Sequence, residues 1–462
     1  MSALEQVLSH VDDHLEESIE RLFDLVRIES ISTDPAYKAE CQKAAEWLER
    51  ELVALKFDAS VRSTPGHPMV VAHTPDQAEG PHVLFYGHYD VQPVDPLELW
   101  EKPPFEPSIT EMSDGSKQLV GRGTSDDKGQ LLTFLEACRA WRSVTGKLPL
   151  NTSIIFEGEE ETGSPSLDAF LAENKDELKA DLALVCDTTM WDRETPAITV
   201  QLRGMMKENL VIKAADRDLH SGAYGSAARN PLHVISSIIA DLRDAQGRVQ
   251  IPGFYDGVEE LPAAIKKQWD SLGFDGATYL RDVGLSISAG EEGYSVLEQI
   301  TSRPTCEVNG VWGGYNGLGS KTVIPAEANA KLTFRLVGKQ EPDKIREAFR
   351  KFVNSRLPDD CTVEYESVGG EFGPLTVDTN MPETQKVIKA LSDEWNKEAA
   401  LMGSGGSIPI TTEFRRVLGM ETLLVGFALE DDRIHSPNEK YDLKSFHKGI
   451  RSWVRIIAAL AA

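Results

Sequence analysis

The chain is poor in cysteine and has no cysteine pattern typical of a disulfide framework or a metal site. Its five cysteines are widely spaced, odd in number and form no C-x-x-C pair. They are Cys41, Cys138, Cys186, Cys306 and Cys361. We therefore expect reduced, mostly buried thiols and a cytoplasmic protein.

Basic side chains are also scarce relative to acidic ones. Lysine and arginine number 48 against 74 aspartates and glutamates, which gives a formal net charge of −26. This balance argues against a nucleic-acid partner, because phosphate binding requires clustered lysine and arginine. No run of about 18 apolar residues occurs, and the acidic, amphipathic start of the chain does not resemble a secretory signal. We expect no membrane association.

Internal repeats and low-complexity tracts are absent from the sequence. A glycine-rich stretch at 313–319 lacks the lysine of a phosphate-binding loop and the strand–helix setting of a dinucleotide site. With 41% hydrophobic and 26% charged residues, the composition is that of a soluble globular protein. A chain of 462 residues is expected to form two or three domains.

Four short apolar runs each end in an acidic residue or lead to a histidine. The runs and the residues after them are 83–87 with His88 and Asp90, 154–156 with Glu157 and 159–161, 182–186 with Asp187, and 423–427 with His435. Continuous apolar runs of this length predict buried strands of a parallel sheet. Ligands bind at the carboxyl ends of such strands, so these side chains are expected to converge. A cluster of His, Asp and Glu without cysteine is typical of a hydrolytic metal centre.

The order of elements predicts an α/β domain with a mainly parallel mixed sheet flanked by helices, interrupted by an inserted α+β domain with an antiparallel sheet. The predicted limits are 1–196 and 373–462 for the first domain and 197–372 for the insertion. Within the insertion, helices are expected near 230–244, 287–299 and 342–355, and strands near 305–312, 327–337 and 361–368.

The two candidate ligands nearest the amino terminus each have a simpler interpretation. His88 and Asp90 could point into one pocket, with His88 binding a metal and Asp90 fixing its tautomer. Alternatively, His88 is a loop histidine beside a solvated aspartate. Asp126 precedes a clear helix, so it could be a helix cap. Two aspartates framed by three glycines favour instead a carboxylate that bridges two cations.

Glu159, Glu160 and Glu161 follow a predicted buried strand, where their charges repel one another. They could form a solvated acidic turn. The functional alternative is that one carboxylate binds a metal while its neighbour acts as general base. Asp187 and His435 could each complete the coordination of one metal ion.

The motifs together resemble a known family over essentially the whole chain. They are His88-Tyr-Asp90, Gly121-Arg-Gly-Thr-Ser-Asp126-Asp-Lys, Glu160-Glu161, Asp187 and His435-Ser-Pro-Asn-Glu. This set is similar to the dinuclear zinc peptidases that include carnosinase, carboxypeptidase G, aminoacylase and succinyl-diaminopimelate desuccinylase, and most similar to the carnosinase-like dipeptidases. The resemblance implies two divalent ions, zinc first and manganese or cobalt as alternatives. The implied ligands are His88, Asp126 (bridging), Glu161, Asp187 and His435.

The same resemblance implies a mechanism, with a cis peptide after Asp126 and a hydroxide bridging the two metal ions. Glu160 would be the general base. The insertion would be a lid that also forms a homodimer, and His220 would reach the partner's active site and steady the scissile carbonyl. Thr322, Arg335, Gly406 and Ser407 match positions that hold the substrate carboxylate. A locally bonded turn histidine and a strand-face arginine in a salt bridge remain the alternatives for His220 and Arg335.

One departure from the family concerns substrate choice. Relatives of the dipeptidase type carry Arg-Glu before the glycine loop, where this chain has Gly403-Ser404. Loss of a guanidinium removes a group suited to a carboxylate or carbonyl. The expected substrate is a dipeptide or short peptide with a free C-terminal carboxylate. Hydrolysis of N-acyl amino acids and a non-catalytic metal-binding scaffold are the alternatives.

Overall fold

The computed structural model describes residues 2–75, 78, 80–406 and 408–462. Two compact units divide the chain. Unit 1 consists of Met1–Val200, Val377–Met402 and Pro409–Ala462, and unit 2 of Gln201–Thr376 and Gly403–Ile408. The chain thus leaves unit 1, forms most of unit 2, returns, and contributes one more short segment to unit 2 before it ends in unit 1. Each unit boundary near 200 and 376 lies a few residues beyond the limit predicted from the sequence.

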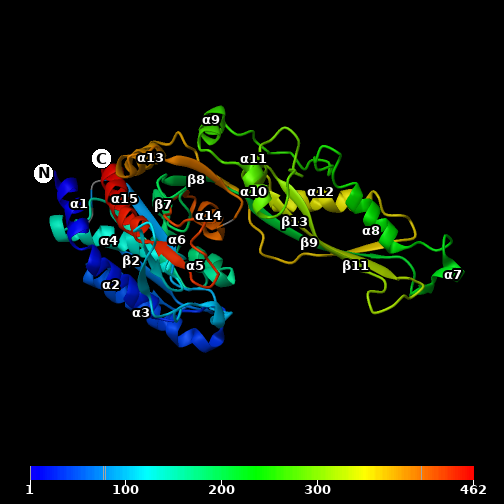
Figure 1. Cartoon of the computed structure of the whole chain (residues 1–462), viewed down its shortest axis with the longest axis horizontal. Helices are drawn as coiled ribbons and strands as arrows, with labels where there is room; N and C mark the ends of the chain where they lie inside the picture. Colours follow the sequence, from blue (N-terminus) through cyan, green and yellow to red (C-terminus); the bar gives the residue numbers. More distant parts are fainter. Residues whose placement is uncertain (1, 76–77, 79, 407) are drawn as a thin grey trace. The chain divides into compact units, whose positions relative to one another are not determined.

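Most strands of a mixed sheet lie in unit 1, which Figure 1 draws with its flanking helices. The order of the sheet is β1-β2-β6-β3-β7-β17-β8-β15, with β16 paired to β8. Its strands are β1 Asp58–Arg62, β2 Met69–His73, β3 His82–His88, β6 Asn151–Glu157, β7 Leu182–Val185, β8 Ala197–Leu202, β15 Leu375–Thr376, β16 Ala400–Ser404 and β17 Glu421–Leu424. The pairs β3–β6, β3–β7 and β7–β17 are parallel, as the sequence predicted. The strands toward both edges are antiparallel.

Helices flank this sheet. They are α1 Ala3–Asp13, α2 Leu15–Val26, α3 Lys38–Ala54, α4 Lys128–Thr145, α5 Leu167–Glu173, α6 Lys175–Leu178, α13 Pro382–Trp395, α14 Pro409–Glu413 and α15 Leu443–Ala461. Phe85 of β3 stacks on Phe134 of α4 at 3.8 Å and packs edge-on against Trp453 of α15. Its neighbour Tyr86 points the other way and contacts Phe414. Both faces of β3 are therefore covered, which explains its continuous apolar sequence.

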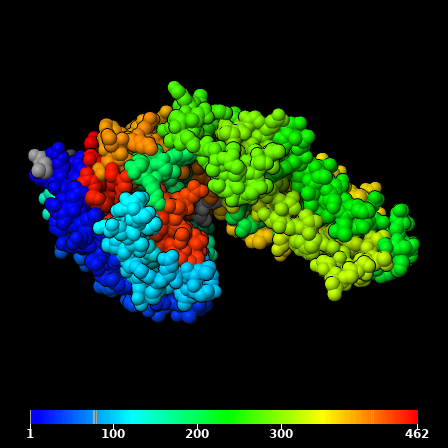
Figure 2. All heavy atoms as spheres, in the orientation of Figure 1, coloured from blue at the N-terminus to red at the C-terminus, as the bar shows by residue number. Residues whose placement is uncertain are grey.

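The two ends of the chain pack together within unit 1. Asp12 of α1 accepts hydrogen bonds from Arg451 and contacts His447 of α15. Figure 2 shows the blue N-terminal and red C-terminal segments adjoining on the surface. A small antiparallel sheet, in the order β18-β5-β4 with bounds Lys440–Asp442, Lys117–Val120 and Ser108–Glu111, joins the last segment to the loop before α4.

Unit 2 contains an antiparallel sheet in the order β11-β13-β9-β14. Its strands and helices are β9 Gly204–Lys213, β10 Leu219–His220, β11 Thr305–Gly313, β12 Val323–Ile324, β13 Glu327–Leu336, β14 Thr362–Glu366, α7 Ser221–Tyr224, α8 Pro231–Ala240, α9 Ala263–Ser271, α10 Gly276–Asp282, α11 Val296–Thr301 and α12 Pro342–Asn354. Alternate residues of β9 and β13 are buried, and α8 and α12 contribute to the same apolar core. The predicted antiparallel α+β insertion is confirmed.

One predicted helix in unit 2 is wrong in extent. The sequence suggested a helix over 287–299, but only Val296–Thr301 is helical. Ser295 and Glu298 form a capping box that starts the helix there. Gly293, directly before this cap region, has a positive φ of 91° that does not fit a helix. The helices α9 and α10 had no counterpart among the predicted elements.

Within the part of the chain that the structure describes, no helix has both the length and the apolar character needed to cross a membrane.

Candidate metal centre

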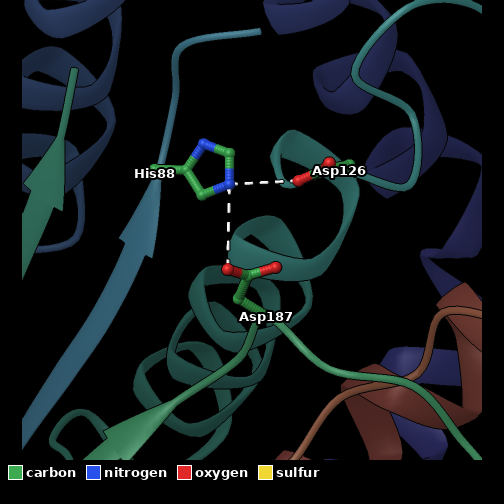
Figure 3. Close-up of side chains that lie close together, drawn as sticks. All are labelled: His88, Asp126 and Asp187. Carbon is green, nitrogen blue, oxygen red and sulfur yellow. Dashed lines mark hydrogen bonds and ion pairs between the residues drawn. The ribbon is translucent and has the colours of Figure 1, made fainter. Parts of the chain in front are cut away.

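The carboxyl ends of the parallel strands meet at one edge of the unit 1 sheet. His88 is the last residue of β3, and Asp187 follows β7, the strand beside it. Asp126 enters from the loop before α4. His88 and Asp187, which follow two of the four apolar runs, therefore lie close to Asp126 (Figure 3). Glu161 and His435, which follow the other two runs, also lie close to Asp126.

The first cluster consists of His88, Asp126 and Asp187. Nε2 of His88 lies 3.0 Å from Oδ1 of Asp126 and 3.9 Å from Oδ2 of Asp187. One ligand atom of each residue lies within 4.8 Å of those of the other two, which is close enough to hold a single metal ion. His88 is fully buried, and Asp126 and Asp187 are largely so.

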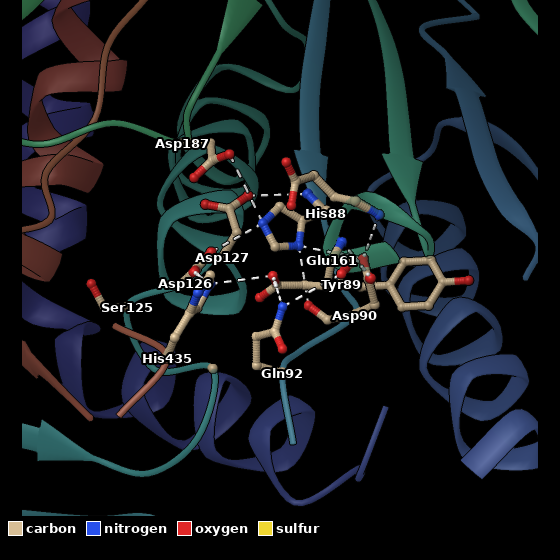
Figure 4. A network of polar contacts seen from close by, with 12 residues as sticks. His88, Tyr89, Asp90, Gln92, Ser125, Asp126, Asp127, Glu161, Asp187 and His435 are labelled. Atoms are coloured by element: carbon tan, nitrogen blue, oxygen red, sulfur yellow. Dashed lines mark hydrogen bonds and ion pairs between the residues drawn. The ribbon is translucent and has the colours of Figure 1, made fainter. Parts of the chain in front are cut away.

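The second cluster shares Asp126 and adds Glu161 and His435. Nε2 of His435 lies 2.9 Å from Oδ2 of Asp126 and 3.2 Å from Oε2 of Glu161. The ligand atoms again lie within 4.8 Å of one another. Asp126 thus turns one oxygen to each histidine, as Figure 4 shows. His435 is 51% exposed, so this cluster is the more open of the two.

The electrostatics of the clusters fit a pair of divalent cations. Burial raises the pKa of Asp187 well above its ordinary value, and the charges of Asp126, Glu160 and Glu161 add to the rise although His88 opposes it. Burial and Asp126 likewise raise the pKa of Glu161. So many carboxylates can all be ionised in a buried place only if cations neutralise them. The donors are imidazole nitrogens and carboxylate oxygens, which suit zinc and similar ions.

Glu160 begins a short 3-10 turn directly after β6 and belongs to neither cluster. Its backbone N–H donates to Oδ1 of Asp90 at 3.3 Å. Burial raises the pKa of its carboxyl to about 7, and the charges of Glu161, Asp126 and Asp90 contribute to the rise although His88 opposes it. A carboxyl with this pKa can exchange a proton at neutral pH.

Glu159 has a different role from its two neighbours. Its oxygens accept hydrogen bonds from the backbone N–H groups of His67, at 2.9 Å, and Ser166, at 3.2 Å. The residue is 2% exposed. The segment is therefore not a solvated acidic turn, and Glu159 tethers it to the neighbouring loops.

Asp90 connects His88 to the glutamate segment. Its backbone oxygen lies 3.1 Å and its Oδ1 3.4 Å from Nδ1 of His88. Its carboxylate also accepts from the backbone N–H of Glu161, at 3.0 Å, and from Oγ of Ser32, at 2.6 Å. The predicted link to the His88 ring is thus accompanied by a contact with the glutamate turn that the sequence did not indicate.

Several buried polar residues around the clusters were not selected from the sequence. Gln92 donates to Oε2 of Glu161 at 2.7 Å, and Oδ2 of Asp127 accepts from the backbone N–H of His88 at 3.0 Å. Nζ of Lys128 donates to the carbonyls at the end of α2. Glu439 bonds the loop that carries Asp126. Of these residues, only Glu439 and the pair Asp127-Lys128 belong to the motifs that resemble the family, and nothing in the spacing of the motifs identifies their partners.

The remaining predicted residues lie in unit 2. His220 pairs with Val323 across β10 and β12, next to Thr322, and its Nδ1 accepts a hydrogen bond from the N–H of Gly222 at 3.0 Å. Arg335 lies on β13 opposite Met205, and burial lowers the pKa of its guanidinium. Gly406 donates from its N–H to Oγ of Ser404 at 3.1 Å. The candidate Ser407 lies outside the described residues.

A second arginine of unit 2 adjoins the glycine loop and was not foreseen. Nε and Nη2 of Arg203 both lie 3.4 Å from the carbonyl oxygen of Gly405. Burial lowers the pKa of Arg203 to about 10, and the positive charge of Arg335 contributes to the shift. The guanidinium group beside this loop is therefore that of Arg203, and the charge of Arg335 acts on it.

This fold and this site define the class of the protein. It is a hydrolytic enzyme with a buried histidine–carboxylate centre. The peptide bond between Asp126 and Asp127 is cis, as the resemblance implied. The chain belongs to Peptidase family M20/M25/M40, whose family model matches residues 84–459. It is a peptidase, and the family resemblance drawn from the motifs is confirmed.

Individual relatives match along nearly the whole chain. The Cys-Gly metallodipeptidase DUG1 of Candida albicans is 29% identical, covering 97% of this chain and 96% of the relative. The Beta-Ala-His dipeptidase of Homo sapiens is 28% identical, covering 99% and 93%. Among solved structures, an M20 family metallo-carboxypeptidase from Sulfolobus solfataricus has a TM-score of 0.78 at 29% identity, covering 96% of this chain and 99% of that one. The dipeptidase Dug1p from Saccharomyces cerevisiae has a TM-score of 0.76 at 25% identity, covering 100% and 99%.

Proposed function

We propose that this peptidase hydrolyses the amide bond of dipeptides or short peptides that end in a free carboxylate. The names of two relatives, a Cys-Gly metallodipeptidase and a Beta-Ala-His dipeptidase, support this substrate class. The observation that carries the proposal is the sharing of Asp126 between two clusters, next to Glu160, a glutamate that belongs to neither cluster.

Two divalent ions would be held by the two clusters. His88, Asp126 and Asp187 would bind one ion, and Asp126, Glu161 and His435 the other. When bound, such ions polarise a carbonyl and lower the pKa of water. Asp90 would orient the His88 ring through Nδ1, leaving Nε2 for the ion.

Glu160 would act as general base and then as general acid. Its carboxylate would take a proton from the attacking water and return that proton to the leaving amine. Because Asp90 holds the backbone N–H of Glu160, the position of the turn is tied to the His88 ring. Glu161, the next residue, would bind the metal ion of the second cluster and would not transfer the proton.

Unit 2 would supply substrate contacts. A neutral imidazole that accepts at Nδ1 carries its proton on Nε2, so His220 could donate from Nε2 to the scissile carbonyl. Thr322, Arg335 and Gly406 would receive the substrate carboxylate. By its family resemblance unit 2 would also form a homodimer, in which His220 serves the partner's site.

The test is a turnover assay on purified protein that has been stripped of metal and reloaded with zinc or manganese. The substrates are a mixed pool of dipeptides, tripeptides and N-acyl amino acids, followed by mass spectrometry. Loss of dipeptides supports the proposal, while selective loss of the acylated substrates would replace it with an aminoacylase-like activity. A Glu160→Gln protein prepared identically excludes contaminating peptidases, because it should leave the pool unchanged.

A further inference from the structure

Glu439 is a fully buried carboxylate that belongs to neither cluster. Its Oε1 accepts from the backbone N–H groups of Ser125, at 2.9 Å, and Asp126, at 3.0 Å. Its Oε2 accepts from the backbone N–H of Gly123, at 2.9 Å, and from Nη1 of Arg122, at 2.7 Å. The side chain is 0% exposed. One carboxylate thus satisfies three backbone donors of an irregular loop and one guanidinium.

The position of Glu439 in the chain links two of the candidate ligands. It bonds directly to the backbone of Asp126, the shared ligand, and follows His435, the ligand of the second cluster, by one short segment. The stretch from Arg433 to Glu439 contains neither helix nor strand, and Arg433, His435 and Asn438 all have positive φ values. Its shape therefore depends on bonds to other parts of unit 1.

Other contacts of the two segments reinforce this link. Oγ of Ser125 donates to Oδ2 of Asp432 at 2.7 Å, and the N–H of Gly121 donates to the carbonyl oxygen of Glu439 at 3.0 Å. Arg122 also donates to the carbonyl oxygen of Pro93 at 3.1 Å. The Glu439 carboxylate accepts more of these hydrogen bonds than the Asp432 carboxylate, and one of them comes from a guanidinium, so it is the strongest single tie among them.

The two clusters differ in what else holds their ligands. In the first cluster, His88 ends β3 and Asp187 follows β7, so the ladder of the sheet fixes both positions. In the second cluster, His435 has no such support from a strand or helix. Loss of the Glu439 bonds should therefore disturb the second cluster more than the first.

We propose that Glu439 is a positioning residue that fixes Asp126 and His435 relative to each other, so that the second cluster binds its divalent ion. The inference rests on the metal sites of the proposed function but not on the identity of the peptide substrate. Glu439 itself does not touch the ion; it acts through the backbone of Asp126 and through the segment that carries His435.

The test compares Glu439→Gln with a matched control, Glu394→Gln. The first substitution keeps the shape of the side chain but turns one acceptor oxygen into a donor that faces N–H groups. Glu394 is likewise a buried carboxylate of unit 1, and it accepts from Arg451 at 2.6 Å and from Arg455 at 2.7 Å. Both variants remove the charge of a buried carboxylate that pairs with arginine, and both should lose thermal stability. Only Glu439 bonds the loop of a ligand.

Metal-stripped protein is titrated calorimetrically with Zn²⁺, and kcat and KM are measured at limiting and excess metal. For Glu439→Gln we expect the first ion to bind as in the wild type and the second about 10- to 100-fold more weakly. The activity lost at limiting metal should return at excess metal. Glu394→Gln should bind both ions normally.

Binding of both ions by Glu439→Gln with wild-type affinity would overturn the proposal, as would equal weakening of both ions. If Glu439→Gln does not fold, Glu439→Asp keeps the charge with a shorter reach and must show the same selective weakening of the second ion. A wild-type protein that binds two ions but cleaves no peptide would refute the proposed substrate class and leave this inference intact.

Discussion

His435 Nε2 lies 2.9 Å from Oδ2 of Asp126, although the two residues come from parts of unit 1 that unit 2 separates in the sequence. Hydrogen bonds to Asp126 and Glu161 raise the pKa of His435 to about 10, against the effect of its partial burial. A protonated His435 is a cation that lies between the carboxylates of Asp126 and Glu161. A divalent ion at the same place would neutralise those carboxylates and displace that proton.

The first prediction concerns the two adjacent glutamates. Glu160→Gln should lower kcat/KM by about 10²- to 10⁴-fold with two metal ions still bound, because only the proton carrier is lost. Glu161→Gln is the matched control and should lose the second ion, because its oxygen lies within the second cluster. Metal content is measured by mass spectrometry beside the kinetics. Near-normal turnover by Glu160→Gln would contradict the assignment of the base.

A site residue could be predicted from the sequence where it follows a strand whose residues are all apolar. The strand β3 and its terminal His88 could be predicted because both faces of the strand are buried, which leaves an unbroken apolar run. The choice among Glu159, Glu160 and Glu161 could not be made as surely from the sequence. It depends on backbone donors of His67 and Ser166 that only the folded chain brings to Glu159.

Other features escaped prediction for related reasons. The role of Glu439 could not be predicted from the motif that it ends. Three of its partners are backbone N–H groups, which have no signature in a sequence. The helix predicted over 287–299 is shorter in the structure because Gly293 has a positive φ and the helix begins at the cap formed by Ser295.

A second prediction concerns stability without metal. Glu157 accepts a hydrogen bond from the hydroxyl of Tyr86 at 2.6 Å, and burial raises its pKa from 4.5 to about 8. The folded state therefore holds a proton that the unfolded state has released. This contribution to stability is fully present below about pH 4.5 and is lost as the pH rises to about 8, at up to about 1.4 kcal/mol per pH unit.

The measurement is urea unfolding of chelator-treated protein between pH 5 and pH 8, compared with Glu157→Gln. The wild type should lose more stability than the variant over this range, because the amide has no proton to release. Parallel curves for the two proteins would show that Glu157 does not carry the effect.

The third prediction explains the departure from the family at Gly403. A Cβ added there would lie 2.7 Å from Cβ of Thr301 and 3.3 Å from Cη2 of Trp269. An arginine side chain does not fit at this position unless α11, which carries Thr301, moves away. Gly403→Ala should therefore destabilise the protein by about 1–3 kcal/mol, and Thr301→Gly should relieve that cost in the double variant.

Calorimetric unfolding of the two single variants and the double variant gives the coupling energy. Gly373→Ala is the control, because a Cβ there would meet nothing within 4 Å. Additive effects of Gly403→Ala and Thr301→Gly would show that crowding against Thr301 is not the reason for the glycine.

The fourth prediction tests whether His220 serves another subunit. His220 belongs to unit 2 and Glu160 to unit 1, so the two substitutions change different units of the chain. His220→Ala and Glu160→Gln should each be nearly inactive as pure proteins. If the protein is a dimer in which His220 enters the partner's site, a mixed dimer contains one site with both residues intact. Activity should therefore return in part after the two variants are mixed and allowed to exchange subunits.

Light scattering establishes the oligomeric state, and a mixture kept below the exchange temperature is the control. A protein in which both substitutions occupy one chain must stay inactive under every condition, because no arrangement of its subunits restores a complete site. If the exchanged mixture stays as inactive as its components while heterodimers are detected by mass spectrometry, His220 acts within its own chain. In that case its Nε2 proton, fixed by the bond from Gly222, would serve the site of the same subunit.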